Sequence, residues 1–336
     1  MKLNDFIHPV NYRGLRGRML DLPFQFEKLD AENLAAKSQA EKSDLKNSND
    51  QKTGLKKSAG SKNRGQKPAE PPRQILFVYG SHSSLERIAA VCEVLSDYGR
   101  VVAPDLPGLG GMDSLYKIGR RASFDEMADY LAWFVRKNLT GQFDVVGMSM
   151  GFAIVSRMLT RHPDLTAQVG RLISYVGLAD RTDFRMKPIW RHLMVAVSWL
   201  GERGWMAWLM RHTFCTRPIL RLIYGHTKNQ KFQGVDFDKT LDAEVKLWQI
   251  NDVKTYCRTA RDMFQLRARG RVALPVVHIA VRGDRYFDNA LVRKHLGEIY
   301  SSVEIVEQAG LHAPSVIAGR AEAAKLLPTA VLKLLK

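Results

Sequence analysis

Ser149 lies at the centre of a five-residue motif whose residue types suit nucleophilic chemistry. The motif reads Gly-Met-Ser-Met-Gly over residues 147–151. Its glycines, Gly147 and Gly151, permit a tight strand-to-helix turn that a side chain would obstruct, and such a turn holds the serine hydroxyl clear of the sheet. A hydroxyl presented in this way attacks a carbonyl carbon when a nearby base removes its proton. The motif therefore predicts acyl chemistry at Ser149.

The segments on either side of the motif agree with this interpretation. A pattern with only three fixed residues also arises by chance, so its structural context has to support it. The apolar run Phe-Asp-Val-Val-Gly at 143–147 has the character of a strand, and residues 151–161 have the character of an apolar helix. The alternative is a serine in an ordinary strand-to-helix turn without catalytic function.

Strands and helices alternate along most of the chain, which predicts an α/β fold with a mostly parallel sheet. The continuous apolar run at 74–79 is typical of a strand buried on both faces. The expected strands cover residues 74–79, 100–103, 143–147, 171–177, 276–281 and 302–306, and the expected helices cover residues 85–98, 123–138, 151–161, 289–299 and 319–336.

The N-terminal part of the chain differs in composition from the rest. Residues 30–72 are rich in Lys, Ser, Asn, Gln and Gly and contain no aromatic residue. Such a segment buries too little apolar surface to offset the entropy of ordering it, which predicts a flexible linker. Residues 1–29 before it form a basic and apolar segment that packs on the domain, binds a surface, or does neither.

The alternation of strands and helices stops between residues 181 and 272. This block has a helical pattern throughout and contains five of the six tryptophans: Trp190, Trp199, Trp205, Trp208 and Trp248. We expect it to be an inserted helical cap. It divides the predicted core into a first part, residues 73–180, and a second part, residues 273–336.

With the serine motif on the fourth-from-last strand of an alternating sheet, residues 74–336 resemble the α/β-hydrolase family. Val-Tyr-Gly-Ser at 78–81 is similar to the family's His-Gly-x loop, with Tyr79 in place of the histidine, and residues 103–110 resemble its D-x-P-G-x-G turn. The resemblance implies an α/β-hydrolase sheet with helices on both faces and an inserted cap.

The resemblance also implies a catalytic triad. Residues 274–284 are similar to the strand that delivers the triad acid, and residues 310–314 to the loop that delivers the histidine. Ser149, Asp284 and His312 then follow the family's order along the chain. His312 is expected to act as the general base, and Asp284 to hold its tautomer and stabilise the imidazolium.

An acyl reaction at Ser149 also requires donors for the developing oxyanion. The resemblance makes the backbone N–H groups of Ser81 and Met150 the candidates. Ser81 ends the loop that is similar to His-Gly-x, whose last N–H binds the oxyanion in the family, and Met150 directly follows the serine. These two positions depend on the backbone, so the identity of their side chains matters little.

The acid is the least determined member of the triad. The family pattern is G-x-x-D, whereas Gly283 directly precedes Asp284 here. Asp288 in the same loop and Asp180 after the preceding strand remain alternative acids. His312 also has an alternative interpretation, as a loop histidine without a catalytic role.

The composition limits the cofactors and partners. The cysteines, Cys92, Cys215 and Cys257, have no metal-ligand spacing, so we expect neither a metal nor another cofactor. The 51 Lys and Arg against 34 Asp and Glu give a net charge of +17, which favours an anionic partner. Basic and aromatic residues mix between 181 and 235, as in helices that contact anionic lipid, and this favours peripheral membrane contact over nucleic acid. The alternative is a cap whose tryptophans pack on the core.

The first residues lack the apolar core of a secretory signal, so we expect a cytoplasmic protein that contacts membranes peripherally at most. Its predicted activity is hydrolysis of a carboxylic ester with a lipophilic acyl part, by an esterase- or lipase-like enzyme. The same triad serves thioesters, amides and acyl transfer. A second class of hypothesis is a non-catalytic binding protein that keeps the α/β-hydrolase fold.

Overall fold

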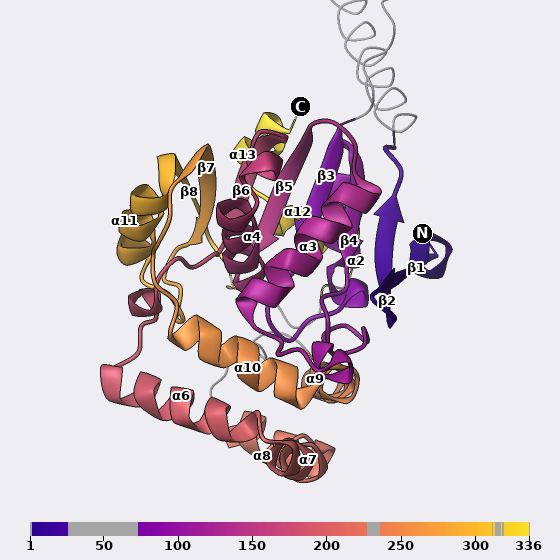
Figure 1. The fold of residues 1–336 in the computed structure, drawn as a ribbon, viewed down its shortest axis with the longest axis vertical. Coiled ribbons are helices and arrows are strands. Elements are labelled where there is room, and N and C mark those ends of the chain that lie inside the picture. Colours follow the sequence, from indigo (N-terminus) through magenta and orange to yellow (C-terminus); the bar gives the residue numbers. More distant parts are fainter. Residues whose placement is uncertain are drawn as a thin grey trace, which may run out of the picture.

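The strands of this protein form one eight-stranded sheet (Figure 1). The computed structural model describes residues 2–25, 73–226, 236–310, 312, 317 and 319–335. The sheet order is β1-β2-β4-β3-β5-β6-β7-β8, and the strands from β3 to β8 pair in parallel. The strands are β1 Ile7–Tyr12, β2 Leu15–Leu22, β3 Gln74–Val78, β4 Arg100–Pro104, β5 Phe143–Met148, β6 Val169–Tyr175, β7 Val272–Val281 and β8 Tyr300–Gln308. The predicted, mostly parallel α/β sheet is confirmed.

A hairpin from the N-terminal segment completes one edge of the sheet. β1 and β2 pair antiparallel with each other, and β2 pairs antiparallel with β4. Arg13 and Gly14, which join the two strands, have φ angles of 53° and 85°, as a tight hairpin turn requires. Of the three alternatives for residues 1–29, the structure shows packing on the domain for its described part. The predicted linker, residues 30–72, lies outside the described residues.

Helices cover both faces of the sheet. On one face α2 packs against α12, and on the other α3 packs against α4 (Figure 1). These helices are α2 Leu85–Leu95, α3 Phe124–Asn138, α4 Met150–Arg161, α5 Pro163–Thr166, α11 Asn289–Ile299, α12 Arg320–Leu326 and α13 Thr329–Leu334, with short 3₁₀ turns η1 Leu3–Phe6 and η2 Leu115–Ile118. The single helix predicted for 319–336 is wrong. Pro328 separates α12 from α13, because proline lacks the N–H that a continuous helix needs and disfavours helical backbone in the residue before it.

A layer of helices lies between β6 and β7 in the chain and beyond one end of the sheet (Figure 1). We call residues 181–226 and 236–264 the helical layer. It comprises η3 Arg181–Asp183, α6 Pro188–Gly201, α7 Gly204–His212, α8 Arg217–His226, α9 Phe237–Ile250 and α10 Val253–Phe264. Gly110 donates its N–H to Asn251 Oδ1 at 2.7 Å, which fixes the layer to the turn after β4. That this layer is a separate cap domain stays a prediction.

His278 is a buried histidine in the middle of the sheet. It belongs to β7, is 1% exposed, and its Nδ1 lies 2.9 Å from Ser174 Oγ on β6. Burial lowers its pKa to about 4, because the charged imidazolium would lose its hydration there. Between about pH 4 and pH 6.5 the unfolded chain therefore binds a proton that the folded protein excludes.

This histidine makes the stability depend on pH. Its folded pKa lies below its unfolded value, so its contribution is complete above pH 6.5 and declines as the pH falls toward 4. Between pH 7.5 and pH 5 we expect it to remove about 2 kcal/mol from the free energy of unfolding. Urea unfolding of the wild type and of His278→Asn at both pH values measures this. The free energy of unfolding of His278→Asn should change less between the two pH values than that of the wild type. An equal change in both proteins would contradict the lowered pKa of His278.

Candidate active site

Ser149 lies at a sharp turn between β5 and α4. Its φ of 49° and ψ of −120° are outside the regions that a side chain normally allows. The turn is fixed on both sides, because Ser149 N donates to Tyr175 O at 2.8 Å and Phe152 N donates to Ser149 O at 3.1 Å. A strained residue held by its surroundings is common at functional sites. The strand, turn and helix that the motif predicts are all present.

The two glycines of the motif stand where α4 approaches the sheet most closely. A Cβ atom at Gly147 would lie 2.7 Å from the Cα of Phe152. At Gly151 it would lie 2.4 Å from the carbonyl oxygens of both Val78 and Tyr79. The chain therefore needs glycine at both positions for the helix to start directly against β3.

We expect Gly151→Ala to destabilise the fold by about 3 kcal/mol or to prevent folding, because the added methyl group meets two backbone carbonyls that cannot rotate away. Gly297→Ala is the matched control. Gly297 lies inside α11 with no atom within 4 Å of the position of a Cβ. That change should be neutral or stabilise by up to about 1 kcal/mol. Urea unfolding measures the free energy of unfolding of both variants. Equal values for Gly151→Ala and Gly297→Ala would contradict the close approach of α4 to the carbonyls of Val78 and Tyr79.

His312 lies between Ser149 and Asp284. Its Nε2 is 3.3 Å from Ser149 Oγ, and its Nδ1 is 2.6 Å from Asp284 Oδ2. The ring packs against Phe287, with centroids 5.0 Å apart and planes at 75°. An ionised Asp284 accepts the Nδ1 proton, which leaves the Nε2 lone pair facing the serine hydroxyl. The structure thus brings together the three residues that the sequence suggested.

Asp284 is held by the backbone of its own loop. Its Oδ1 accepts hydrogen bonds from the N–H of Tyr286 at 2.8 Å and of Phe287 at 3.3 Å. Burial would raise its pKa, but the hydrogen bond and charge of His312 and these two N–H groups outweigh burial, so the pKa is lowered. Asp284 is therefore a carboxylate at neutral pH.

The alternative acids lie elsewhere and have other hydrogen-bond partners. Asp288 accepts from the N–H groups of the first turn of α11, at 3.0 and 3.3 Å. Asp180 accepts from the N–H of Thr182 at 2.8 Å and of Ala268 at 3.1 Å. Both cap the start of a helix or 3₁₀ turn, and the structure brings only Asp284 of the three to a ring nitrogen of His312.

The loop after β3 passes beside the nucleophile. A Cβ at Gly80 would lie 3.1 Å from the Cβ of Ser149, so Ser81 follows directly after this close approach. Met150 is the first residue of α4, and its N–H therefore has no acceptor within the helix. These placements suit an oxyanion site, and the role of both N–H groups stays a prediction.

Tyr79 occupies the position of the histidine in the family's His-Gly-x loop, and its contacts are structural. Its hydroxyl donates to Asp105 Oδ1 at 3.0 Å and accepts from the N–H of Leu106 at 3.0 Å. Arg18 of β2 reaches the other oxygen of Asp105, also at 3.0 Å. Burial raises the pKa of Asp105 to about 7, although Arg18 and Tyr79 counteract it. These contacts fix the start of the loop after β3 to the turn after β4.

One residue near the site, Glu244, was missed by the sequence analysis, which placed His82 close to the oxyanion loop but on the wrong segment to be the base. Glu244 of α9 is fully buried, and its Oε2 lies 3.3 Å from His82 Nε2. His82 has a φ of 51° and its ring stacks on Trp248 at 4.3 Å. They attach the loop after β3 to the helical layer. The sequence carries no signal for this pair, because α9 lies far along the chain from His82.

Comparison with known families agrees with this geometry. Residues 80–323 match the model of the alpha/beta hydrolase family. The chain belongs to this family. The match covers more than half of the sequence and includes Ser149, Asp284 and His312. Membership supports hydrolase activity, whereas the bond that is cleaved is a separate question.

Solved structures show the same fold at low sequence identity. Epoxide hydrolase CorEH aligns with a TM-score of 0.61 and 14% identity, over 98% of this chain and 96% of that one. An esterase from Thermogutta terrifontis aligns with a TM-score of 0.52 and 18% identity, over 79% and 91%. An N-acyl homoserine lactonase, AidH, aligns with a TM-score of 0.56 and 14% identity, over 92% and 90%. A search of curated proteins finds no significant match.

A cavity of about 280 Å³ opens at the triad of this alpha/beta hydrolase. Ser149 and His312 line it together with apolar side chains from the core and the helical layer, among them Phe77, Ile88, Val91, Phe184, Tyr256 and Met263. Apolar walls with a few polar groups are typical of small-molecule sites. Among the described residues, no group of three His, Cys, Asp or Glu is placed to hold a metal ion.

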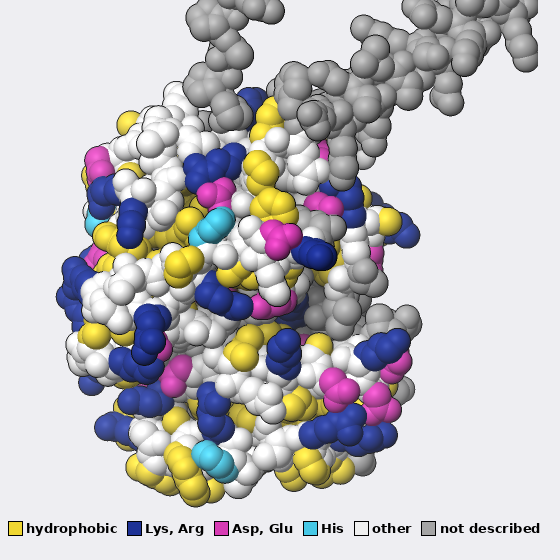
Figure 2. Space-filling view, turned by 90° about the vertical axis from the view of Figure 1, so that its right-hand side faces the viewer, with side chains coloured by type: hydrophobic (Ala, Val, Ile, Leu, Met, Phe, Trp, Pro, Cys, Tyr) yellow, Lys and Arg dark blue, Asp and Glu magenta, His cyan; other side chains and the backbone are white. Residues whose placement is uncertain are grey.

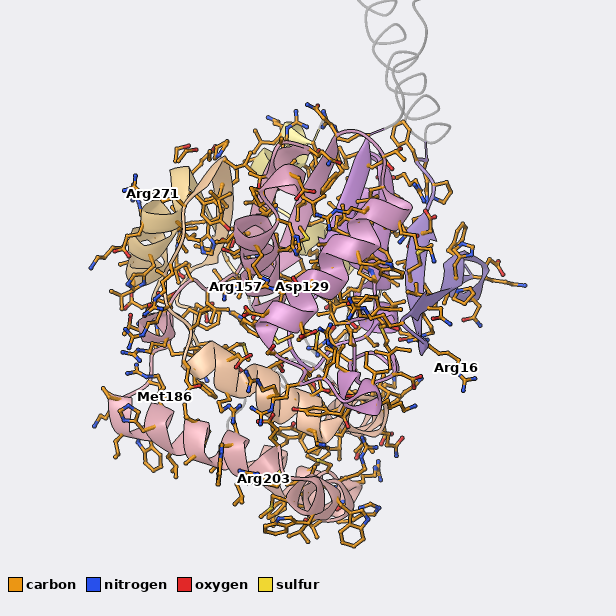
Figure 3. All side chains as sticks on the ribbon, in the orientation of Figure 1. Arg16, Asp129, Arg157, Met186, Arg203 and Arg271 are labelled. Atoms are coloured by element: carbon orange, nitrogen blue, oxygen red, sulfur yellow. The ribbon has the colours of Figure 1, made fainter. Side chains whose placement is uncertain are left out.

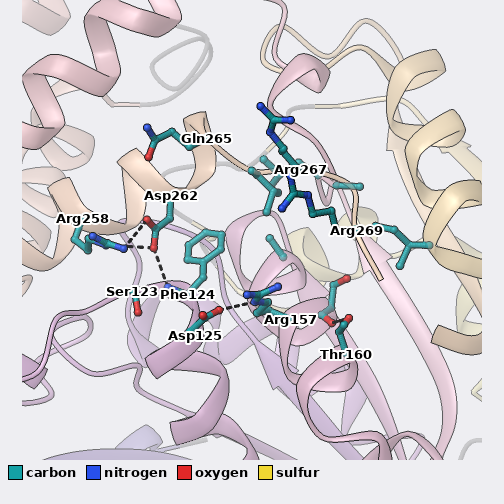
Figure 4. Close-up of a pocket in the computed structure, with 16 residues that line it drawn as sticks. Ser123, Phe124, Asp125, Arg157, Thr160, Arg258, Asp262, Gln265, Arg267 and Arg269 are labelled. Atoms are coloured by element: carbon teal, nitrogen blue, oxygen red, sulfur yellow. Dashed lines mark hydrogen bonds and ion pairs between the residues drawn. The ribbon is translucent and has the colours of Figure 1, made fainter. Parts of the chain in front are cut away.

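A larger hollow of about 560 Å³ lies between α10 and the start of α3. Figure 4 shows Arg157 paired with Asp125 and Arg258 paired with Asp262 there. Its lining includes hydroxyl groups but neither histidine nor cysteine. Its two carboxylates, Asp125 and Asp262, are paired with arginines, whereas the smaller cavity is lined by a serine hydroxyl within hydrogen-bond reach of a histidine, so the smaller cavity is the candidate active site.

Proposed function

We propose that this protein is a serine hydrolase that cleaves carboxylic esters through an acyl-enzyme. The observation that carries the proposal is the position of His312, with one ring nitrogen 3.3 Å from Ser149 Oγ and the other 2.6 Å from Asp284 Oδ2. A nucleophile, a base and an orienting carboxylate within hydrogen-bond reach are the requirement for this chemistry.

The proposed reaction has two halves. Ser149 Oγ attacks the ester carbonyl while His312 Nε2 takes the hydroxyl proton and Asp284 stabilises the imidazolium. The N–H groups of Ser81 and Met150 bind the oxyanion. His312 then gives its proton to the departing alcohol, which leaves an acyl group on Ser149. In the second half His312 activates a water molecule, which releases the acid and restores the serine.

The nature of the nucleophile favours an acyl bond over an epoxide. A serine that opened an epoxide would form an ether, and water cannot release an ether by addition to a carbonyl. An ester of serine is hydrolysed through the same oxyanion site that formed it. The esterase and the lactonase among the structural neighbours act on acyl compounds of this kind.

The lining of the cavity supports a lipophilic acyl group as the substrate part beside Ser149. Phe77, Ile88 and Val91 form an apolar wall, and burial of each methylene group against such a wall contributes about 0.8 kcal/mol. A cavity of about 280 Å³ accommodates a short or medium acyl chain. Activity on p-nitrophenyl esters of increasing chain length measures this preference, and thioester and amide analogues rank the alternative leaving groups.

A fluorophosphonate probe tests the proposal. The probe should label the native protein at a single serine, and mass spectrometry of the digest should locate the adduct on Ser149. Heat-denatured protein and His312→Gln should remain unlabelled, because both lack an activated hydroxyl. An unlabelled native protein, or an adduct on another residue, would overturn the assignment and favour a non-catalytic binding protein.

A further inference from the structure

Helix α6 carries its apolar side chains on the outside. The residues that it buries are Arg191, Ser198 and Gly201. Its exposed side includes Ile189 and Trp190, residues that are 69% and 56% exposed. A helix on the surface of a soluble protein normally has the opposite arrangement, with its apolar stripe toward the core.

The same exposure continues over α7 and α8. Ten of the twelve large hydrophobic residues that are exposed in the described parts of the chain lie between 189 and 223. We call these ten the apolar face: Ile189, Trp190, Leu193, Val197, Trp199, Trp205, Trp208, Phe214, Leu222 and Ile223. Figure 2 shows hydrophobic side chains gathered at the lower end of the molecule. Exposed large apolar side chains concentrated in one part of a surface mark interaction sites.

Cationic side chains stand at both ends of α6. Arg185 and Lys187 precede the helix and line a shallow hollow with Met186, Trp190 and Met194. Arg203 follows the helix, and its guanidinium lies 4.4 Å from the centre of the Trp199 ring. Figure 3 shows Met186 and Arg203 at opposite ends of α6, so the apolar residues lie between two basic regions.

The anionic groups in this part of the chain are already engaged. Residues 181–226 contain eight Lys or Arg and two acids, Asp183 and Glu202. Asp183 is buried beside His295, and Glu202 pairs with Arg261 of α10 at 2.9 Å. Arg217 and Arg221 pair with acidic residues of α9, and Arg185 donates to the carbonyl of Phe287 at 2.9 Å. Lys187 and Arg203 then remain to meet an anionic partner.

We propose that the apolar face docks on an anionic lipid membrane. Helices α6, α7 and α8 lie in the plane of the interface, with their tryptophans at the boundary between headgroups and acyl chains. Lys187 and Arg203 contact anionic headgroups. Mixed tryptophan and cationic side chains on one face suit this position because the rings prefer the interface and the charges remain hydrated. No helix among the described residues is long and apolar enough to cross a membrane, so the contact is peripheral.

Charge argues against two other partners for the apolar face, a second copy of the chain and the chain's own N-terminal segment. A second copy of the chain would bring two faces of the same positive sign together, which costs free energy unless anions intervene. The N-terminal segment 27–72 has no aromatic residue and more Lys and Arg than acids, so it matches neither the apolar nor the charged part of the surface. A lipid surface supplies both an apolar phase and negative charge.

Docking would bring the candidate active site close to the membrane. α10 packs against α6 and contributes Tyr256 and Met263 to the lining of the cavity at Ser149. Membrane binding is a property of the surface alone and does not depend on the proposed hydrolase activity. The inactive variant Ser149→Ala should therefore bind vesicles as the wild type does.

Vesicle flotation of the full chain tests the proposal. We expect at least tenfold higher recovery with vesicles of phosphatidylcholine and 30% phosphatidylserine than with phosphatidylcholine alone. The triple variant Trp190→Ser, Trp205→Ser, Trp208→Ser should fall to background. Leu291→Ser, an exposed apolar residue on α11, is its matched control and should bind normally. Thermal melts confirm that these surface changes leave the fold intact.

A second pair of variants tests the charges. Lys187→Gln with Arg203→Gln should weaken binding about fivefold per charge, because a juxtamembrane cation contributes about 1 kcal/mol. Arg16→Gln with Arg271→Gln removes the same charge from sites away from α6 (Figure 3) and should have little effect. Equal recovery with neutral and anionic vesicles, or no binding to either, overturns the proposal. A second result would also overturn the proposal: the wild type forms a dimer in the absence of vesicles, and the triple tryptophan variant does not. That result would assign the apolar face to contact with a second copy of the chain.

Discussion

Alanine at position 149 is expected to lower kcat for ester hydrolysis by about 10⁴- to 10⁶-fold without unfolding the protein. The loss follows from the proposed mechanism, since no other hydroxyl group is held 3.3 Å from His312 Nε2 among the described hydrogen bonds. Residual activity would come from the oxyanion donors and from substrate binding, which alanine leaves in place. Initial rates on p-nitrophenyl esters, together with binding of an unreactive ester analogue, measure the two effects separately.

Ser149→Gly provides a control that separates activity from stability. The φ of 49° at this position strains any residue with a side chain, and glycine adopts it freely. The glycine variant should be as inactive as alanine but more stable than alanine, by about 1 kcal/mol. Retention of more than a tenth of the wild-type kcat in either variant would show that Ser149 is not the nucleophile.

The features predicted correctly from sequence are those that neighbouring residues determine. The turn at Ser149 depends on two glycines and their flanking apolar segments, and the parallel strands depend on short apolar runs between amphipathic helices. The break at Pro328 is equally local. A proline inside a helical pattern indicates a helix end, so the sequence carries a signal for two helices within 319–336.

The features that could not be predicted depend on contacts between distant segments. Nothing in the local sequence of Glu244 indicates that it faces His82, and nothing in Tyr79 indicates that Arg18 and Asp105 surround it. The pairing of the N-terminal hairpin with β4 is of the same kind. Such contacts emerge only when the sheet order is known, because residues far apart in the chain become neighbours.

The choice among three aspartates shows the same limit at the active site. Asp180, Asp284 and Asp288 all follow strands or begin helical turns, so spacing alone left them open. The structure separates them by their partners. Two of them accept hydrogen bonds from the first N–H groups of a helix or 3₁₀ turn, and one holds His312. A measurement on the three matched amide variants converts this geometry into a test of function.

Asp284→Asn is expected to lower kcat by about 10⁴-fold while leaving the fold intact. Oδ1 of Asp284 accepts from the N–H groups of Tyr286 and Phe287, so in the variant the amide oxygen must take that place. The amide NH₂ then occupies the position of Oδ2, 2.6 Å from His312 Nδ1, and donates to it. His312 is left with its proton on Nε2, which can no longer accept the proton of Ser149.

The other two amide variants are matched controls for this argument. Asparagine caps a helix about as well as aspartate, so Asp288→Asn should keep the stability of the wild type and a kcat within about twofold of it. Both oxygens of Asp180 accept backbone N–H groups, from Thr182 and Ala268, and an amide offers only one acceptor. Asp180→Asn should therefore lower the free energy of unfolding by about 1–3 kcal/mol while its kcat stays within about twofold of the wild type. Steady-state kinetics of the three purified variants, with melting temperatures, provide the comparison. A 10⁴-fold loss in Asp288→Asn or Asp180→Asn, with Asp284→Asn still active, would reassign the acid. If only Asp284→Asn is impaired in kcat, Asp284 is the triad acid, because the variant puts a donor in place of the acceptor that faces His312 and leaves the loop's two backbone hydrogen bonds unchanged.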